Sequence, residues 1–167
     1  DANITATVEI HVVETKTALE SMTINLDVLG IPSSSYVGSA DAPGSANVDG
    51  VSFSWIQLGN YGNGLQWRAK GNKNGTGCLW NTTAFEKGIS KIEFVFTAGK
   101  IANDTTDAFN FEFGTDNTFA AQTTTLSTLT TETTYTVTPN AETYTFVRIT
   151  NNAGAQYLQS IVIYFAA

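Results

Sequence analysis

The side chains best suited to binding chemistry lie in the segment 59–85, GNYGNGLQWRAKGNKNGTGCLWNTTAF. It contains two of the three tryptophans, the single cysteine, and many Gly and Asn residues of the kind that form turns. In CLWN, Leu79 is the expected inward residue, so the alternation of a strand turns Trp80 outward. Tyr61 lies at the tip of an expected hairpin, and Arg68 lies on the outward side of the strand that follows.

An exposed aromatic ring beside amides and a guanidinium has the chemistry that binds a sugar. The C–H face of a pyranose stacks on the aromatic ring, and its hydroxyls form hydrogen bonds with planar polar groups. We therefore expect Trp80 to be the stacking platform, Tyr61 a second wall, and Arg68 and Asn81 the polar contacts. The alternative is two hairpins that close a core, with Trp80 sealing the end of the fold and Arg68 balancing nearby acids.

The residues of the chain do not favour nucleophilic catalysis or metal binding. Cys78 is the only cysteine and His11 the only histidine, and they lie far apart in the sequence. A Cys–His nucleophile pair and a zinc site are therefore not expected, and Cys78 is interpreted as a small buried residue. The segments NDTTD (103–107) and GTDN (114–117) contain carboxylates and amides that suit calcium, but neither follows an EF-hand loop. We expect no metal site and no cofactor, with a structural calcium ion as the alternative.

Glycoside hydrolysis requires two carboxylates that face one cleft. Glu86, Glu93 and Glu112 are candidates, but Glu93 and Glu112 lie on the expected outward faces of strands. Since the chain has fifteen acids, we interpret them as solvated surface residues. The motifs G-x-S-x-G, H-E-x-x-H and the P-loop do not occur. The chain is therefore not expected to be an enzyme.

The composition limits the partners of the chain. Charged residues make up 14% of the 167 residues, and the formal net charge is −7. This charge repels a phosphate backbone, so we do not expect nucleic-acid binding. No apolar run approaches the roughly 18 residues of a membrane span, so membrane insertion is not expected. Low charge with many hydroxyl and amide side chains fits an extracellular, cell-surface or virion-surface location.

Short segments of alternating apolar and polar residues predict β-strands along the chain. In AFNFEF, Phe109, Phe111 and Phe113 face one way and the residues between them face the other. Trp55 and Trp67 are in phase with apolar neighbours and are expected in the core. The other segments of this kind are 4–12, 22–29, 51–58, 65–70, 89–96, 144–150 and 157–165. Both faces of the last one are apolar, which predicts a position in the middle of a sheet or against a partner.

Turn and loop residues separate these segments. Residues 30–50 are rich in Gly, Ser and Pro and are predicted to form a long loop. Residues 59–64 and 71–77 each predict a hairpin. The Thr-rich segment 122–139 predicts an edge strand after a loop, with an O-glycosylated linker as the alternative. No segment has a helical period, so we predict one all-β domain over residues 1–167, an antiparallel two-sheet β-sandwich of jelly-roll type.

The second half of the chain carries a family resemblance. A loop-borne aromatic leads into LWNTTAFEKGISKIEFVF (79–96), and the chain ends with the strand, Gly/Asn turn and strand of YTFVRITNNAGAQYLQSIVIYF (144–165). This pattern resembles non-catalytic β-sandwich domains of the carbohydrate-binding-module type, jelly-roll and galactose-binding-like, in secreted bacterial and phage proteins. The resemblance implies binding of a polysaccharide or surface glycan without turnover, within a multidomain parent protein.

A structural role remains the alternative. A subunit or decoration domain of a virion, filament or cell-surface layer uses the same fold with purely structural contacts. The regular segment 4–12 and the apolar segment 157–165 both suggest strand addition between neighbouring copies. This alternative implies a homo-oligomer with no affinity for sugars.

Overall fold

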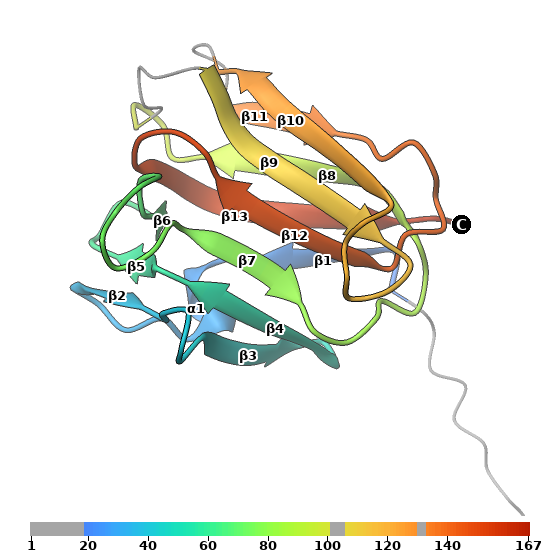
Figure 1. Ribbon diagram of the computed structural model, residues 1–167, viewed down its shortest axis with the longest axis horizontal. Helices are drawn as coiled ribbons and strands as arrows, with labels where there is room; N and C mark the ends of the chain where they lie inside the picture. The colour runs from blue at the N-terminus through green and yellow to red at the C-terminus, as the bar shows by residue number, and fades with distance from the viewer. Residues whose placement is uncertain (1–18, 101–105, 130–132) are drawn as a thin grey trace, which may run out of the picture.

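The computed structural model describes residues 19–100, 106–129 and 133–167. In this part of the chain, two antiparallel sheets pack face to face with the apolar side chains between them (Figure 1). The six-stranded sheet lies in front in Figure 1, and the seven-stranded sheet lies behind it. The predicted all-β, two-sheet antiparallel sandwich is therefore confirmed.

Along the sequence, the chain adds one or two strands to one sheet and then passes to the other. The seven-stranded sheet contains β1 (Ser21–Ile24), β2 (Ser35–Val37), β5 (Leu58–Asn60), β6 (Leu65–Trp67), β8 (Ile89–Phe96), β11 (Thr134–Val137) and β13 (Gln156–Phe165). The six-stranded sheet contains β3 (Gly44–Val48), β4 (Val51–Ile56), β7 (Cys78–Asn81), β9 (Thr106–Gly114), β10 (Gln122–Thr128) and β12 (Phe146–Asn151). The chain crosses repeatedly from one sheet to the other, as jelly-roll connections do.

The strand order shows which strands lie in the middle of each sheet. The six-stranded sheet has the order β10-β9-β12-β7-β4-β3. The seven-stranded sheet has the order β11-β8-β13-β6-β5-β2, and β1 pairs with β13 beside β6. The strands β7 and β12 therefore lie in the middle of the six-stranded sheet, where each has a partner on both sides.

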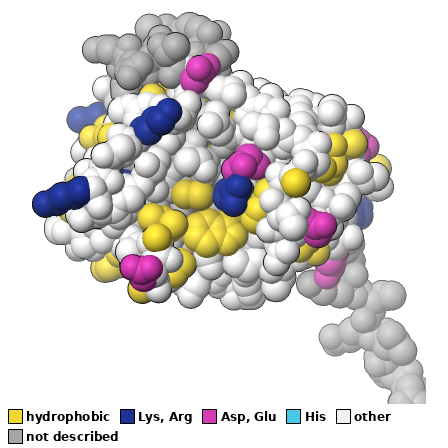
Figure 2. Space-filling view, in the orientation of Figure 1, with side chains coloured by type: hydrophobic (Ala, Val, Ile, Leu, Met, Phe, Trp, Pro, Cys, Tyr) yellow, Lys and Arg dark blue, Asp and Glu magenta, His cyan; other side chains and the backbone are white. Residues whose placement is uncertain are grey.

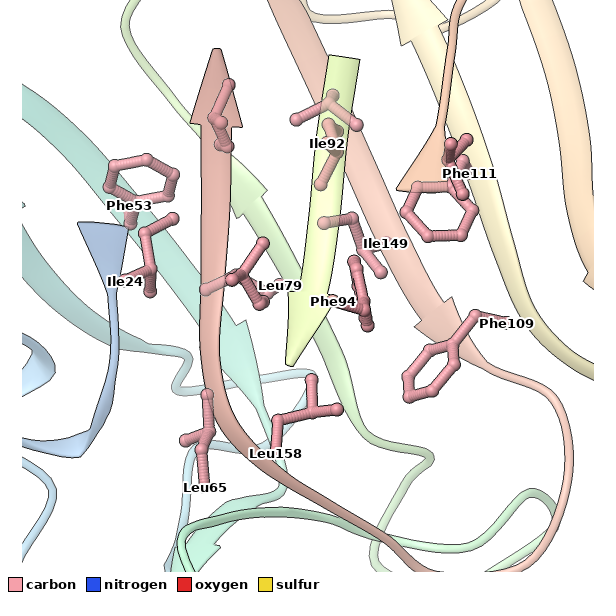
Figure 3. Packing of buried hydrophobic residues seen from close by; sticks show 14 of the residues in the cluster. Ile24, Phe53, Leu65, Leu79, Ile92, Phe94, Phe109, Phe111, Ile149 and Leu158 are labelled. Carbon is pink, nitrogen blue, oxygen red and sulfur yellow. The ribbon is translucent and has the colours of Figure 1, made fainter. Parts of the chain in front are cut away.

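Aromatic side chains form the centre of the core. Phe94 from β8 lies 5.0 Å from Phe109 and 5.1 Å from Phe111 of β9, measured between ring centroids (Figure 3). Trp67 is fully buried and packs edge-on against Phe109 at 5.3 Å. Trp55 is also buried, so both tryptophans occupy the core as predicted. Such edge-to-face pairs stabilise a core beyond the area that they bury.

Two predicted elements have different boundaries in the structure. The segment 22–29, predicted as one strand, forms β1 and then the short helix α1 (Leu26–Leu29). The side chain of Asn25 accepts hydrogen bonds from the backbone N–H groups of Asp27 and Val28 and so begins the helix. The predicted loop 30–50 contains the short strands β2 and β3. No helix in the described residues is long and apolar enough to cross a membrane.

The segment 51–58, predicted as one strand, crosses between the sheets at Gln57. This residue has φ +50°, which ends β4 in one sheet and begins β5 in the other. Its side-chain amide donates to the backbone oxygen of Gly38 at 2.7 Å, which stabilises this unusual conformation. Alternation alone does not predict the crossing, because the residues on both sides of Gln57, Ile56 and Leu58, are apolar.

The hairpin predicted at 59–64 is confirmed, because β5 and β6 pair antiparallel across it. The second hairpin, predicted at 71–77, is wrong. The strand before this segment, β6, belongs to the seven-stranded sheet, and β7 after it belongs to the six-stranded sheet. Residues 71–77 are therefore a connection between the sheets rather than a turn within one.

The prediction for the Thr-rich segment 122–139 holds in part. Its edge strand is confirmed by β11, which pairs only with β8 in the described part of the chain. The residues before it, predicted as a loop, contain a second edge strand, β10, which pairs with β9. The last strand, β13, lies mid-sheet, with β8 along one side and β6 and β1 along the other. The predicted first strand, 4–12, lies outside the described residues, so the extent of the predicted domain 1–167 stays a prediction.

Substitution of the buried Trp67 tests the core. We expect Trp67→Ala to lower the free energy of unfolding by about 3–5 kcal/mol, because a large side chain leaves a cavity between the sheets. The control is Val28→Ala on the exposed side of α1, where a change within about 0.5 kcal/mol is expected. Both values come from denaturant unfolding followed by tryptophan fluorescence and circular dichroism. Equal stability of the two variants would contradict the assigned core.

Candidate functional site

The pleat of the six-stranded sheet places Trp80 on its outer face. Leu79 points into the core and is almost completely buried, so its neighbour Trp80 points away and is only partly covered. Register pairs Trp80 with Arg148 of β12 on one side and with Ser54 of β4 on the other. The predicted outward orientation of Trp80 is thus confirmed.

One row of outward side chains crosses the whole sheet through Trp80. From β3 to β10 the paired residues are Ser45, Ser54, Trp80, Arg148, Glu112 and Thr123. The row contains one aromatic ring, one cation and one carboxylate, and its remaining members are hydroxyl side chains. Such a row presents a stacking surface flanked by hydrogen-bonding groups.

An ion pair lies next to Trp80 in this row. The guanidinium of Arg148 donates from Nε to one carboxylate oxygen of Glu112 at 2.6 Å and from Nη2 to the other at 2.7 Å. The hydrogen bonds to Glu112 raise the pKa of Arg148, so the guanidinium keeps its charge. The guanidinium also lies 5.0 Å from the ring centroid of Phe119. The side chain of Arg148 is therefore held by two neighbours.

Together these residues line a shallow hollow, which we call the Trp80 surface. It has a volume of about 350 Å³ and is lined by Ile56, Cys78, Trp80, Glu112, Phe119, Arg148 and Thr150. Figure 2 shows hydrophobic side chains gathered at the middle of this face, with one cationic and one acidic group directly beside them. Apolar area next to a fixed polar pair is the usual composition of a small-ligand site.

Asn81, expected as a polar contact to a ligand, is fully buried. Its amide nitrogen donates to the backbone oxygens of Thr83 at 2.8 Å and Thr145 at 2.9 Å. Its side-chain oxygen accepts from the backbone N–H of Val147 at 2.8 Å. The first bond holds the loop that follows β7, and the other two join β7 to the beginning of β12, so the structure assigns Asn81 to the scaffold.

Tyr61 and Arg68 lie together on the outer side of the other sheet. Tyr61 is 48% exposed, and its ring centroid lies 5.2 Å from that of Tyr36 in β2. The guanidinium carbon of Arg68 lies 4.2 Å from the centroid of the same Tyr36 ring. Beside them, the side-chain amide of Gln66 donates to the hydroxyl of Tyr157 at 3.1 Å. We call these five residues the tyrosine surface.

The four residues expected to form one site therefore occupy three places. Trp80 lies on the six-stranded sheet, Tyr61 and Arg68 on the seven-stranded sheet, and Asn81 in the interior. The local sequence pattern did not place Arg148 and Glu112 beside Trp80, because they lie far from Trp80 in sequence and meet it only through strand register. The sequence signal for Glu112 was its position between Phe111 and Phe113, which turns its side chain to the outer face of the strand.

Two of the three candidate carboxylates for hydrolysis, Glu93 and Glu112, lie on opposite sides of the sandwich, and Glu86 lies in the loop after β7. Glu93 is on the outer face of β8, where it accepts from Lys91 at 2.6 Å and from the hydroxyl of Tyr164 at 3.0 Å. Glu112 is on the outer face of the other sheet. These two acids cannot face one cleft, as paired general acid and base residues must.

The segments proposed for calcium are only partly described. Asp116 accepts from both the backbone N–H and the hydroxyl of Thr118, which lowers the pKa of its carboxyl. In the described ranges, no group of three or more His, Cys, Asp or Glu side chains is placed to hold a metal ion. Much of the segment 103–107 lies outside those ranges, so the structural calcium ion stays a prediction.

The buried amide of Asn81 generates a stability prediction. We expect Asn81→Ala to lower the free energy of unfolding by about 2–4 kcal/mol, because it leaves backbone groups without partners at about 1–3 kcal/mol each. Asn74→Ala, at an exposed position in the connection before β7, should change stability by less than about 0.5 kcal/mol. Thermal melts of both variants measure the difference, and similar melts would show that the amide is dispensable.

The thiol of Cys78 generates a reactivity prediction. Cys78 is buried at the base of the Trp80 surface, and its sulfur lies 3.4 Å from the hydroxyl oxygen of Thr150. Burial raises the pKa of Cys78, so little reactive thiolate forms at neutral pH. Iodoacetamide should modify the native protein much more slowly than the unfolded protein at the same pH, as followed by mass spectrometry. Equal rates would contradict the burial of this thiol.

Comparison with known proteins gives distant matches in structure alone. No family model matches the chain, and no match is found among curated proteins. A mutant of the lectin binding domain of Lectinolysin, complexed with Lewis b, is similar with a TM-score of 0.46 and 11% identity over 84% of this chain and 96% of that one. A low affinity xylan binding module, CBM86, from Roseburia intestinalis is similar with a TM-score of 0.34 and 13% identity over 87% of this chain and 96% of that one. Neither match bears on the position of a site.

Proposed function

We propose that the protein is a non-catalytic binding module for a neutral glycan chain, which binds at the Trp80 surface. The observation that carries this proposal is the partly exposed Trp80 ring, placed in a shallow hollow between hydroxyl side chains and a fixed ion pair. The indole presents an apolar face for the C–H side of a sugar ring. Its N–H donates no hydrogen bond to any residue that the structure describes, so it is available to a sugar hydroxyl.

The charge of the Trp80 surface favours a neutral ligand. Arg148 and Glu112 neutralise each other through two short hydrogen bonds. The remaining polar side chains of the row, such as Ser54 and Thr123, carry no charge. A sugar hydroxyl can accept from the guanidinium and donate to the carboxylate, so the pair offers both kinds of contact without a net charge. A polysaccharide fits a row that continues across the sheet better than a compact ligand does.

The same residues argue against turnover of the bound sugar. Glu112 is the single carboxylate among the residues that line the hollow, and its two oxygens are both occupied by Arg148. Acid–base hydrolysis of a glycosidic bond needs a second carboxyl group on the other side of that bond. Binding without catalysis is therefore the function that we assign to this surface, in a protein at the cell surface, outside the cell or on a virion.

Two features of the sequence suggested a structural subunit, and the structure removes one of them. The last strand was expected to be available to a neighbouring copy, but β13 is paired along both sides within its own chain. The other motive, the segment 4–12, lies outside the described residues. Sedimentation of the isolated protein distinguishes the two roles. A monomer that binds a neutral glycan supports the module, and an oligomer without sugar affinity supports assembly.

Removal of the Trp80 ring tests the proposed function. We expect Trp80→Ala to weaken binding of a neutral polysaccharide by roughly ten- to a hundredfold, the usual effect of losing an aromatic hot-spot residue. The fold should remain close to wild type, because Trp80 lies outside the core. The measurement is affinity electrophoresis against xylan, β-glucan, galactomannan and mannan, with titration calorimetry on the best binder and a reducing-sugar assay for turnover.

Tyr164→Ala is the matched control. Tyr164 is also a partly exposed aromatic residue, but it lies on the outer face of the seven-stranded sheet beside Glu93 and Lys91. Its loss should leave the affinity unchanged. Three results would overturn the proposal: no neutral polysaccharide binds, Trp80→Ala binds as well as the control, or the wild-type protein releases reducing ends. If Trp80→Ala destabilises the fold as much as Trp67→Ala does, Trp80 belongs to the core instead of a binding surface.

A further inference from the structure

The tyrosine surface is built as a second ligand site. Tyr36, Gln66 and Tyr157 lie in one row across β2, β5, β6 and β13, and Gly59 occupies the place between Tyr36 and Gln66. A Cβ atom at Gly59 would lie 2.9 Å from the Tyr36 ring, so the missing side chain leaves room for that ring. The ring in turn contacts Tyr61 and Arg68. The guanidinium of Arg68 thus lies over the Tyr36 ring, and Tyr61 packs against the same ring.

The guanidinium of Arg68 has no acidic partner within the described ranges of the chain. Its Nε atom is buried and donates to no acceptor there, whereas Arg148 on the other sheet has two bonds to Glu112. A buried donor without an acceptor costs free energy, and a bound anion would remove that cost. Burial raises the pKa of Tyr36, so the adjacent phenol stays neutral and keeps its proton for donation.

The local charge has the opposite sign to the whole chain. The net charge is −7, yet residues 50–85 contain no Asp or Glu and include Arg68, Lys70 and Lys73. Both lysines are exposed. Lys and Arg side chains project at the left end of the molecule in Figure 2, where Figure 1 places β5 and β6. A cationic region next to aromatic rings attracts a ligand that has both a negative charge and a ring face.

We propose that the tyrosine surface binds an acidic glycan, in which a sugar ring stacks on Tyr61 and the carboxylate of that sugar pairs with Arg68. The phenols of Tyr36 and Tyr157 supply hydrogen bonds to the hydroxyls, and the buried amide of Gln66 holds the hydroxyl of Tyr157 in place. A carboxylate accepts two parallel bonds from a guanidinium, which a neutral sugar cannot do. This site is independent of the Trp80 surface, because it lies on the other sheet and uses none of its residues.

The probes are two acidic polysaccharides, polygalacturonate and alginate. Fully methyl-esterified polygalacturonate is the uncharged control for polygalacturonate. Polyglutamate carries carboxylates without sugar rings. We expect the wild-type protein to bind both acidic polysaccharides, to bind the methyl ester and polyglutamate at least about tenfold more weakly, and to lose affinity as salt rises. Affinity electrophoresis and titration calorimetry supply the constants.

Variants separate the two surfaces. Arg68→Gln and Tyr61→Ala should each weaken binding of the acidic polysaccharides by about tenfold or more. Lys87→Gln removes the same charge from the loop after β7 and should have little effect, and Trp80→Ala should retain full affinity for these probes. Tyr61 is largely exposed, so this variant tests the site even if Arg68→Gln is unstable.

Four results would overturn the proposal. The wild-type protein binds neither acidic polysaccharide, polyglutamate or the methyl ester binds equally well, Arg68→Gln and Tyr61→Ala behave like Lys87→Gln, or Trp80→Ala loses the acidic ligand. The last result would place that ligand on the Trp80 surface. Loss of neutral-glycan binding in Trp80→Ala does not affect this test, so the two proposals fail separately.

Discussion

The burial of phenylalanine between the two sheets is the constraint on which both outer faces depend. Phe111 and Phe113 are fully buried, so the pleat of β9 turns Glu112 outward between them. The same alternation in β12 buries Val147 and Ile149 and turns Arg148 outward. Backbone register then aligns these two residues with Trp80 in neighbouring strands. The core therefore determines which side chains meet on the surface, although none of them belongs to it.

Two buried asparagines hold the ends of the strand pair that carries this row. Asn81 joins the end of β7 to the beginning of β12. At the other end of β12, the amide of Asn151 donates to the backbone oxygens of Arg68 and Gly154, and its oxygen accepts from Ala153. In each case the side chain forms hydrogen bonds with backbone groups beyond the strand ends. Buried polar groups need such partners. The bond from Asn151 to Arg68 also connects the two sheets near the tyrosine surface.

The sequence predicted what alternation controls. The two-sheet fold, the core positions of Trp55 and Trp67, the mid-sheet last strand and the outward direction of Trp80 all follow from a period of two residues. The errors lie where the chain changes sheet or where a polar side chain serves the backbone. Gln57 crosses between the sheets at a positive φ with no break in the apolar pattern, and the Gly/Asn residues of 71–77 look like a hairpin. Asn81 looks like a surface residue because two of its three partners, Thr145 and Val147, lie far away in the sequence. Trp80 meets Arg148 through the register of two strands that are far apart in the sequence. The local pattern of residues does not predict that register.

The difference between the two outer faces has a simple electrostatic origin. Arg148 faces a carboxylate in the next strand, so its charge is neutralised on the protein itself. Arg68 belongs to a stretch of the chain without acids, and its neighbours in the sheet are tyrosines and an amide. Since the Debye length is about 8 Å at physiological ionic strength, the negative charge of distant surfaces is largely screened at Arg68. Packed sheets lie about 10 Å apart, so a single sugar cannot contact both outer faces, and each face presents its own chemistry to a separate segment of ligand.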